Sequence, residues 1–291
     1  MAFASLKIMV TGSSGFIGSH LMDRLIKVGH LVYSLDKSEG TSTSDFSNLE
    51  PYLECDVDLI VHLGANCSSQ ISLRDPSTDF TDNVIGTFNI CEFSRLKGSI
   101  PIIFNSTMKI YPGEDGIIPP YGLSKRIGEM YLREFGKLYE IPFIINRPSS
   151  VYGPRQNGSE DGGWLTWFIR ASLSNRHIKL FGDGTQSRDV LYIDDHIDLL
   201  LEEIEQFEKF RNEDFDFGGG KDNEIDLNSV LDFLEYSNFS LAPKLAGDVQ
   251  RFVCDNRKLK SYSDWNPKIG WREGIERTTK YFAMQNDSVL N

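Results

Sequence analysis

Lys7-Ile8-Met9-Val10-Thr11-Gly12-Ser13-Ser14-Gly15-Phe16-Ile17-Gly18 is the stretch that decides the fold. Its apolar run predicts a buried strand, and the later positions Leu21, Leu25 and Val28 have the spacing of an amphipathic helix. The glycines between them, one at every third residue, indicate a tight turn that lets the backbone approach a ligand. Free N–H groups at the start of such a helix favour a pyrophosphate, although a glycine pattern by itself is a weak signal.

The composition is typical of an ordinary globular protein. The chain has 291 residues, of which 40% are hydrophobic and 25% charged, enough for one large domain or two joined domains. Its formal net charge of −12 argues against a general affinity for nucleic acid or anionic membranes. The cysteines Cys55, Cys67, Cys91 and Cys254 lack metal-binding spacing, so we expect no metal site and a reducing, cytoplasmic environment. We expect no signal peptide and no transmembrane segment.

Strands and helices are expected to alternate along the first half of the chain. The apolar runs 31–35, 57–63, 100–104 and 142–146 resemble strands, and helical patterns cover 48–54, 80–97 and 121–139. This order implies right-handed βαβ units and an α/β fold with a Rossmann-like, doubly wound parallel sheet. Later we expect a helix that opens at 162–168, strands at 178–181 and 214–217, a helix at 197–207, and helix and loop from about residue 222 onwards.

Candidate functional residues follow the expected strands, because ligands of open α/β sheets bind beyond the carboxyl ends of the strands. Asp36 ends the second strand, where a carboxylate can bind a ribose hydroxyl and repel a 2′-phosphate, which favours NAD over NADP. The adjacent Lys37 weakens that preference. Tyr121 and Lys125 are one helical turn apart, so we expect the ammonium to lower the pKa of the phenol and make it a usable acid/base. The same spacing also occurs by chance on many surface helices.

These motifs together resemble the extended short-chain dehydrogenase/reductase family, in particular its NAD-dependent nucleotide-sugar epimerase/dehydratase branch. The resemblance runs nearly end to end through residues 11–18 (TGSSGFIG), 62–65 (HLGA), 83–87 (NVIGT), 121–125 (YGLSK), 147–156 (RPSSVYGPRQ), 188–195 (RDVLYIDD) and 247–255 (GDVQR with a later Asp). It implies epimerisation of a nucleotide-diphosphate sugar with NAD. The common activity of the family is inversion at C4 of a UDP-hexose, but 106–111, 147–150 and 163–168 look more like CDP-paratose (tyvelose) 2-epimerases, so both remain open.

The resemblance also implies roles for individual residues. Tyr121 would be the general acid/base, Lys125 its partner, and Thr107 would orient the sugar hydroxyl. The implied cofactor-binding residues are Gly12, Ser14, Gly15, Phe16, Ile17, Asp36, Lys37, Asp45, Phe46, Leu63, Gly64, Ala65, Asn83, Tyr121, Lys125 and Pro148. The implied substrate-binding residues are Ser150, Phe181, Arg188 and Arg251, with the two arginines on the diphosphate.

The same resemblance suggests a domain division and an assembly. Residues 1–149 and 184–217 would form the NAD-binding Rossmann domain. Residues 150–183 and 218–291 would form a smaller, discontinuous C-terminal lobe that binds the nucleotide sugar. We expect a homodimer through the helices at 80–97 and 121–139, as in members of the family.

Some positions depart from the family pattern. The stretches 36–57 and 107–121 are short, and Ser150 stands where many members have asparagine. Met108 and Lys109 stand where the 4,6-dehydratases have an Asp-Glu pair that performs elimination, which speaks against dehydration. The alternatives are a nucleotide-sugar 4-keto reductase that uses NADPH and a non-catalytic NAD-sensing module. Asp36 argues against the first, and an intact Thr107, Tyr121 and Lys125 against the second.

Overall fold

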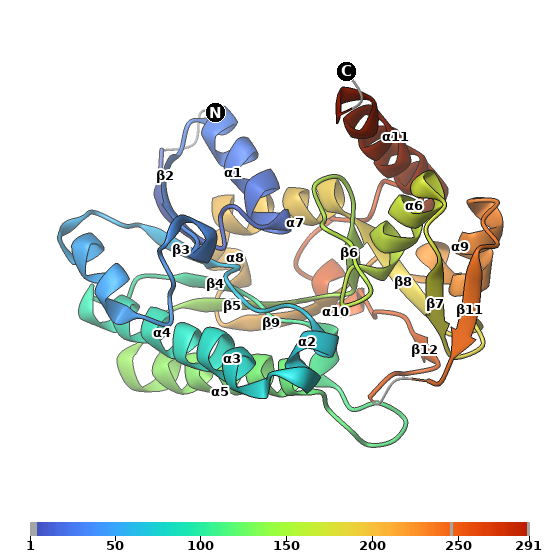
Figure 1. The fold of residues 1–291 in the computed structure, drawn as a ribbon. Coiled ribbons are helices and arrows are strands. Elements are labelled where there is room, and N and C mark those ends of the chain that lie inside the picture. The colour runs from blue at the N-terminus through green and yellow to red at the C-terminus, as the bar shows by residue number, and fades with distance from the viewer. Residues whose placement is uncertain (1–4, 245–246, 290–291) are drawn as a thin grey trace. The chain divides into compact units, whose positions relative to one another are not determined.

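The computed structural model describes residues 5–244 and 247–289, with side chains described as far as Gln285 in the last helix. Contacts within the chain group it into two compact units (Figure 1). One unit contains the residues up to Ile110, Pro119–Arg147 and Ile197–Phe215; the other contains Tyr111–Ile118, Pro148–His196 and the residues from Asp216 onward. The functional domain bounds expected from the sequence stay a prediction.

The first unit is built on a six-stranded sheet with the order β2-β1-β3-β4-β5-β9. Its strands are β1 (Lys7–Thr11), β2 (Leu31–Leu35), β3 (Leu59–His62), β4 (Ile102–Asn105), β5 (Phe143–Pro148) and β9 (Glu213–Phe217). β1 pairs in parallel with β2 on one side and with β3 on the other, and β3, β4 and β5 continue in parallel. The strand order therefore reverses at β1, which confirms the predicted doubly wound sheet and places its switch point beyond β1 and β3.

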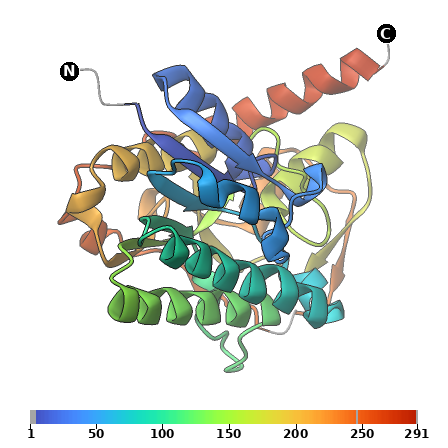
Figure 2. The ribbon, with the colours of Figure 1, turned by 90° about the vertical axis from the view of Figure 1, so that its left-hand side faces the viewer.

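Helices cover both faces of this sheet. α4 (Gly86–Leu96) and α5 (Pro120–Tyr139) run side by side on one face, teal and green in Figure 2. α1 (Phe16–Val28) and α7 (Ile193–Glu205) lie on the other face (Figure 1), where Arg24 of α1 donates to Asp198 of α7 at 2.9 Å. Two prolines at the start of α5 favour its first turn, because their fixed φ suits a helix and the missing N–H has no partner there anyway.

Short helices fill the connections of the first unit. They are the 3₁₀ helices Lys37–Glu39, Phe46–Asn48, Glu50–Glu54 and Met108–Ile110, the α-helices α2 (Ser69–Arg74), α3 (Pro76–Asp79) and α8 (Phe207–Phe210), and the π-helix Phe80–Ile85. The helix expected over 80–97 is therefore a π-helical turn that continues into α4. The helix expected at 48–54 is a 3₁₀ helix.

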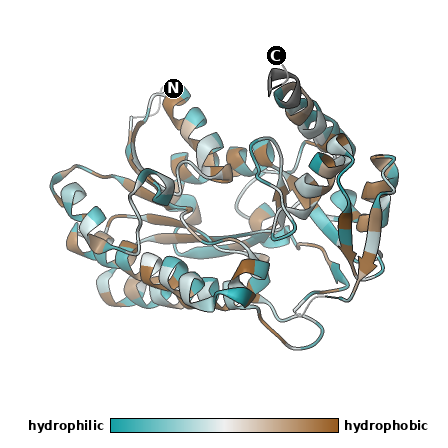
Figure 3. Cartoon of the chain, viewed as in Figure 1, coloured by the Kyte–Doolittle hydropathy of each residue, from teal (hydrophilic) through white to brown (hydrophobic). Residues whose placement is uncertain are grey.

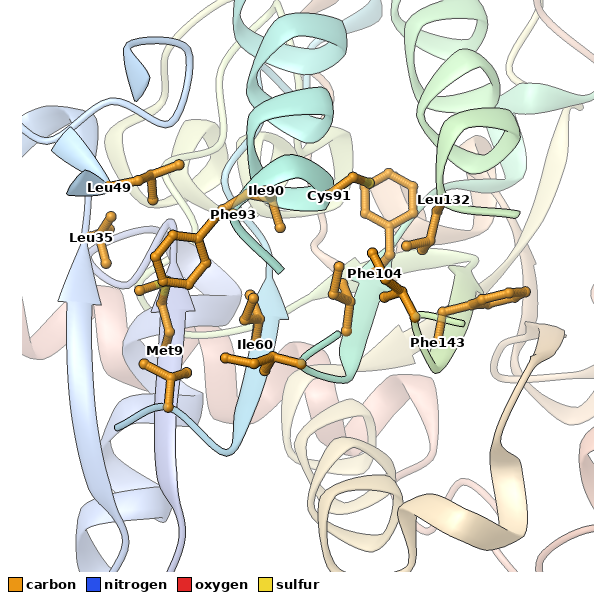
Figure 4. Packing of buried hydrophobic residues seen from close by; sticks show 14 of the residues in the cluster. Met9, Leu35, Leu49, Ile60, Ile90, Cys91, Phe93, Phe104, Leu132 and Phe143 are labelled. Atoms are coloured by element: carbon orange, nitrogen blue, oxygen red, sulfur yellow. The ribbon is translucent and has the colours of Figure 1, made fainter. Parts of the chain in front are cut away.

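The core of the first unit lies between the sheet and the helices α4 and α5 (Figure 4). Met9, Ile60 and Phe104 from the strands meet Phe93 of α4 and Leu132 of α5, and all five side chains are buried. Figure 3 shows hydrophobic stretches along these strands. Strands covered by helices on both faces are apolar nearly throughout, which is why the sequence shows continuous apolar runs rather than alternation.

The second unit contains two small sheets. The four-stranded sheet has the order β10 (Glu224–Asp226), β8 (Ser187–Tyr192), β12 (Arg251–Phe252), with β6 (Ser150–Tyr152) also paired to β8; the other sheet joins β11 (Phe239–Ala242) to β7 (Ile178–Phe181). Its helices are α6 (Trp164–Ser174), α9 (Leu227–Phe233), α10 (Arg257–Lys260), α11 (Trp271–Val289) and the 3₁₀ helix Lys221–Asn223. The expectation of only helix and loop after residue 222 was wrong, because β10, β11 and β12 are too short to show a period.

No helix in the described residues is both long enough and apolar enough to cross a membrane.

Gly18→Ala is a test of the glycine turn. A Cβ at Gly18 would lie 2.0 Å from the carbonyl oxygen of Gly12, so α1 would have to move away from β1. We expect the free energy of unfolding to fall by on the order of 2 kcal/mol, measured by urea denaturation. Gly270→Ala is the control, because no heavy atom lies within 4 Å of a Cβ there. Equal losses in the two variants would contradict the packing argument.

Candidate active site

The glycine turn closes against the end of β3. Gly12 has a φ of +68°, and a Cβ there would lie 2.8 Å from the Cα of Gly64. The hydroxyl of Thr11 accepts a hydrogen bond from the Gly64 amide at 3.0 Å, which holds the two strand ends together. Gly15 is the N-cap of α1, and it makes no side-chain capping bond in the described structure. The turn therefore offers uncapped helix amides beside a glycine backbone, which fits the pyrophosphate of a dinucleotide.

Two carboxylates stand at the end of β2. Asp36 accepts a hydrogen bond from the Ser14 amide at 3.0 Å, and Glu39 accepts one from the Ser14 hydroxyl at 2.5 Å. Lys37 does not offset them, because its ammonium pairs with Asp82 at 3.0 Å. This edge of the site would repel a 2′-phosphate and fits NAD better than NADP. Glu39 was not predicted, because it belongs to no motif and is brought to the turn by the 3₁₀ helix after Asp36.

In the short segment after β2, the two residues predicted to contact the adenine make contacts within the protein. The Asp45 carboxylate accepts a hydrogen bond from the Ser47 amide at 3.0 Å and so caps the following 3₁₀ turn. The Phe46 side chain packs against the hydrophobic core between the sheet and α4. A cofactor contact from Asp45 or Phe46 stays a prediction.

Asn83, on the π-helix, ties the loop after β3 to helix α5. Its side-chain oxygen accepts from the Asn66 amide at 2.8 Å, and its side-chain nitrogen is 3.0 Å from Asp79 Oδ1 and 2.9 Å from Ser124 Oγ. These bonds make Asn83 a structural tie of the site, and its cofactor contact stays a prediction. Its partners Asn66, Asp79 and Ser124 were not predicted from the sequence. Only Ser124 carried a signal, since it lies inside the motif that contains Tyr121 and Lys125.

The structure brings Thr107, Tyr121 and Lys125 together at the end of β4. The Thr107 hydroxyl hydrogen-bonds to the Tyr121 phenol, and the Tyr121 amide donates to the Ser72 hydroxyl at 3.0 Å. The Lys125 ammonium lies 4.2 Å from the centroid of the Phe104 ring. All three candidate catalytic side chains belong to buried residues. A hydroxyl, a phenol and an ammonium in one place can exchange a proton with a bound alcohol.

Burial dominates the proton equilibria of this site. It raises the pKa of the Tyr121 phenol above its ordinary value, and the hydrogen bond with Thr107 acts in the opposite direction. Burial also lowers the pKa of Lys125 to about 8, against the attraction of Glu129, Cys67 and Asp79. The expected lowering of the phenol pKa was therefore wrong for the ligand-free protein, because burial, with Cys67 and Asp79, outweighs the hydrogen bond with Thr107. Lys125 remains mostly protonated at pH 7.

The other candidate cofactor residues lie at element ends. Phe16 and Ile17 begin α1, Leu63, Gly64 and Ala65 follow β3, and Pro148 is the last residue of β5. In the second unit, Ser150 begins β6 and pairs with Val190 of β8, whereas Phe181 ends β7 in the other sheet.

The two candidate diphosphate-binding arginines lie on neighbouring strands of the second unit. Arg188 is on β8 and Arg251 on β12, where Arg251 is paired with Ser187. Each arginine has a carboxylate partner: Arg188 pairs with Asp248 at 2.5 Å, and Arg251 with Glu224 at 2.6 Å. The Arg188 side chain is 12% exposed and the Arg251 side chain 61% exposed.

Known proteins match this chain over most of its length. The model of the NAD dependent epimerase/dehydratase family matches residues 8–218. A putative UDP-glucose 4-epimerase from Methanocaldococcus jannaschii is 31% identical over 96% of this chain and 99% of its own length. CDP-paratose 2-epimerase from Salmonella typhi is 27% identical over 94% of this chain and 98% of its own. The crystal structure of UDP-glucose 4-epimerase with UDP-glucose from Thermotoga maritima has a TM-score of 0.87 and 30% identity, covering 97% of this chain and 100% of that chain.

Proposed function

The chain belongs to the NAD dependent epimerase/dehydratase family, and we propose that Thr107, Tyr121 and Lys125 carry out its reaction, the NAD-dependent epimerisation of a nucleotide-diphosphate sugar. The observation that supports this assignment most is the meeting of these three side chains at the end of β4, in the same unit as a glycine turn that fits a dinucleotide. For the substrate we propose a UDP-hexose inverted at C4. The relative named as a UDP-glucose 4-epimerase is the more similar of the two, and C2 inversion of a CDP-sugar remains the second candidate.

The residues of the site have separate tasks in this proposal. Tyr121 takes the proton of the sugar hydroxyl and gives it back, and Thr107 holds that hydroxyl against the phenol. Lys125 keeps a positive charge beside the phenol, which favours its ionised form. Bound NAD would take a hydride from the sugar carbon, return it to the opposite face and bring a positively charged ring to the site.

In this proposal the first unit binds the cofactor, and the second unit binds the sugar nucleotide. Gly12, Gly15 and the first turn of α1 would hold the pyrophosphate, and Asp36 the adenosine ribose. In the second unit, Arg188 and Arg251 would contact the diphosphate of the substrate, since guanidinium groups bind such oxygens in pairs. The expected domain division, with NAD on the first domain and the nucleotide sugar on the second, is part of the same proposal.

Tyr121→Phe is the central test. Because only the phenolic proton carrier is lost, turnover should fall by on the order of a hundredfold or more, while NAD and nucleotide binding stay nearly unchanged. The assay is NMR of UDP-, CDP-, GDP- and dTDP-sugars for altered stereochemistry. Tyr131→Phe is the matched control, because it lies on the same helix and is 40% exposed.

Two results would oppose this function. One is a Tyr121→Phe variant that keeps most of its activity. The other is stoichiometric consumption of added NADPH on a keto-sugar, which would indicate the 4-keto reductase instead. Retention of NAD⁺ through purification would agree with an epimerase.

We also propose that the protein is a homodimer through α4 and α5. One side of α5 exposes large apolar side chains at Leu123 (48%), Met130 (60%) and Leu138 (68%), and Leu96 of α4 is 49% exposed. These positions of α5 share one helical face, which is the pattern of a helix that packs against a partner. The cysteines are free thiols, which suits the cytoplasmic location that we propose as well.

Met130→Glu should separate the dimer, because a charge would be buried at the contact without a partner. We expect light scattering at micromolar concentration to show a dimer for the wild type and a monomer for this variant. Ile26→Glu is the control, since Ile26 is 61% exposed on α1, away from this face. A monomeric wild type would refute the proposed assembly.

A further inference from the structure

Helix α5 carries a buried carboxylate one turn beyond Lys125. Glu129 is only 4% exposed, yet its side chain accepts three hydrogen bonds. The Ser106 hydroxyl donates to Oε1 at 2.5 Å, and Arg147 donates through Nε at 2.8 Å and through Nη2 at 2.6 Å. The contact with Arg147 is bidentate, which is the strongest and most directional form of such a pair.

Arg147 has a second carboxylate partner. Its Nη1 donates to Asp214 of β9 at 2.8 Å, and Arg133 of α5 pairs with the same Asp214 at 3.1 Å. Arg133 also approaches Glu129 at 3.8 Å. The Asp214 side chain is 26% exposed and that of Glu129 5%. Buried ion pairs contribute little net stability once desolvation is counted, so stability alone does not explain this cluster.

The partners of Glu129 are adjacent to catalytic groups in the chain. Ser106 directly precedes Thr107, and Glu129 follows Lys125 by one helical turn. The carboxylate therefore joins the end of β4, which carries Thr107, to the helix that carries Tyr121 and Lys125. A loss of these bonds would let the two elements shift, and small displacements of reacting groups cost large factors in rate.

We propose that Glu129 is a positioning residue of the reaction, which fixes the strand end that carries Thr107 against the helix that carries Tyr121 and Lys125 and places a carboxylate one helical turn from Lys125. This inference rests on the proposed function of those three residues.

The surroundings of Lys125 give the sign of the charge effect. The groups that face it are Glu129 of α5, Cys67 of the loop after β3, Asp79 of α3, the neutral His62 of β3 and the Phe104 ring of β4. Burial lowers the pKa of Lys125, and Glu129 is the strongest of the groups that raise it. Without that carboxylate the pKa of Lys125 falls further, so the ammonium is lost at a lower pH than in the wild type.

The test compares Glu129→Gln with Asp214→Asn. Each change removes one carboxylate partner of Arg147, but only the first removes the group that faces Lys125. The first readout is an NMR titration of ¹³C-labelled lysine in the ligand-free protein, with the Lys125 signal identified by its loss in Lys125→Arg. The second is the pH dependence of kcat and KM for the sugar nucleotide.

We expect Glu129→Gln to move the Lys125 titration to lower pH and to reduce kcat about tenfold or more near neutral pH, with little change in KM. Asp214→Asn should leave the titration in place. An unchanged titration in Glu129→Gln, or an equal shift in Asp214→Asn, would overturn the inference. If Glu129→Gln does not fold, Glu129→Gln with Arg147→Met replaces it, because both buried charges are then removed together.

The titration does not depend on turnover. A shifted Lys125 signal in a protein whose Tyr121→Phe variant keeps its activity would therefore show that the proposed function is wrong while the charge effect of Glu129 is right.

Discussion

The close backbone contact between Gly12 and Gly18 is the constraint on which the rest of the first unit depends. It sets α1 against β1 and leaves the turn between them open to a pyrophosphate. From there a chain of contacts leads to the candidate catalytic residues. The neutral His62 hydrogen-bonds to Thr11 at 2.7 Å and to Thr87 at 3.1 Å, and its ring stacks on Phe104, which also contacts the Lys125 ammonium. Burial lowers the pKa of His62 to about 3, so the imidazole stays neutral at every physiological pH and the two hydrogen bonds do not change with pH.

Burial and charge oppose each other at this site, and the balance between them suits an enzyme that must hold a proton temporarily. Loss of hydration keeps the Tyr121 phenol protonated in the free protein. The same loss of hydration lowers the pKa of Lys125. Glu129, Cys67 and Asp79 raise it again in part, so that the pKa is about 8. In the proposed reaction, bound NAD would add positive charge near the phenol and would favour its ionised form together with Lys125.

The features that could be predicted from the sequence are those that depend on a local pattern of residues. The glycine spacing, the apolar runs and the acidic end of β2 led to the doubly wound parallel sheet and to Asp36 as a candidate residue, because each reports on a single element. Glu39, Asp79 and Glu129 could not be found in this way, since each acts through a partner far away in the chain. The family resemblance suggested an adenine contact for Phe46, and that contact stays a prediction, because the structure shows only that the side chain packs against the core. The phenol pKa was misjudged because helical spacing indicates that Lys125 is near but does not measure how much water is lost.

The second unit carries the two arginines that we propose for the diphosphate of the substrate, in a chain with a net charge of −12. Its two candidate arginines are both held by carboxylates, but in different surroundings. Arg188 and Asp248 are mostly buried, so separating them would leave uncompensated charges away from water. Arg251 and Glu224 form a more exposed pair, which is worth little and can be exchanged for another anion. We therefore expect Arg188 to contact the diphosphate while it keeps its place in the β8–β12 framework, and Arg251 to turn from its carboxylate to reach the substrate.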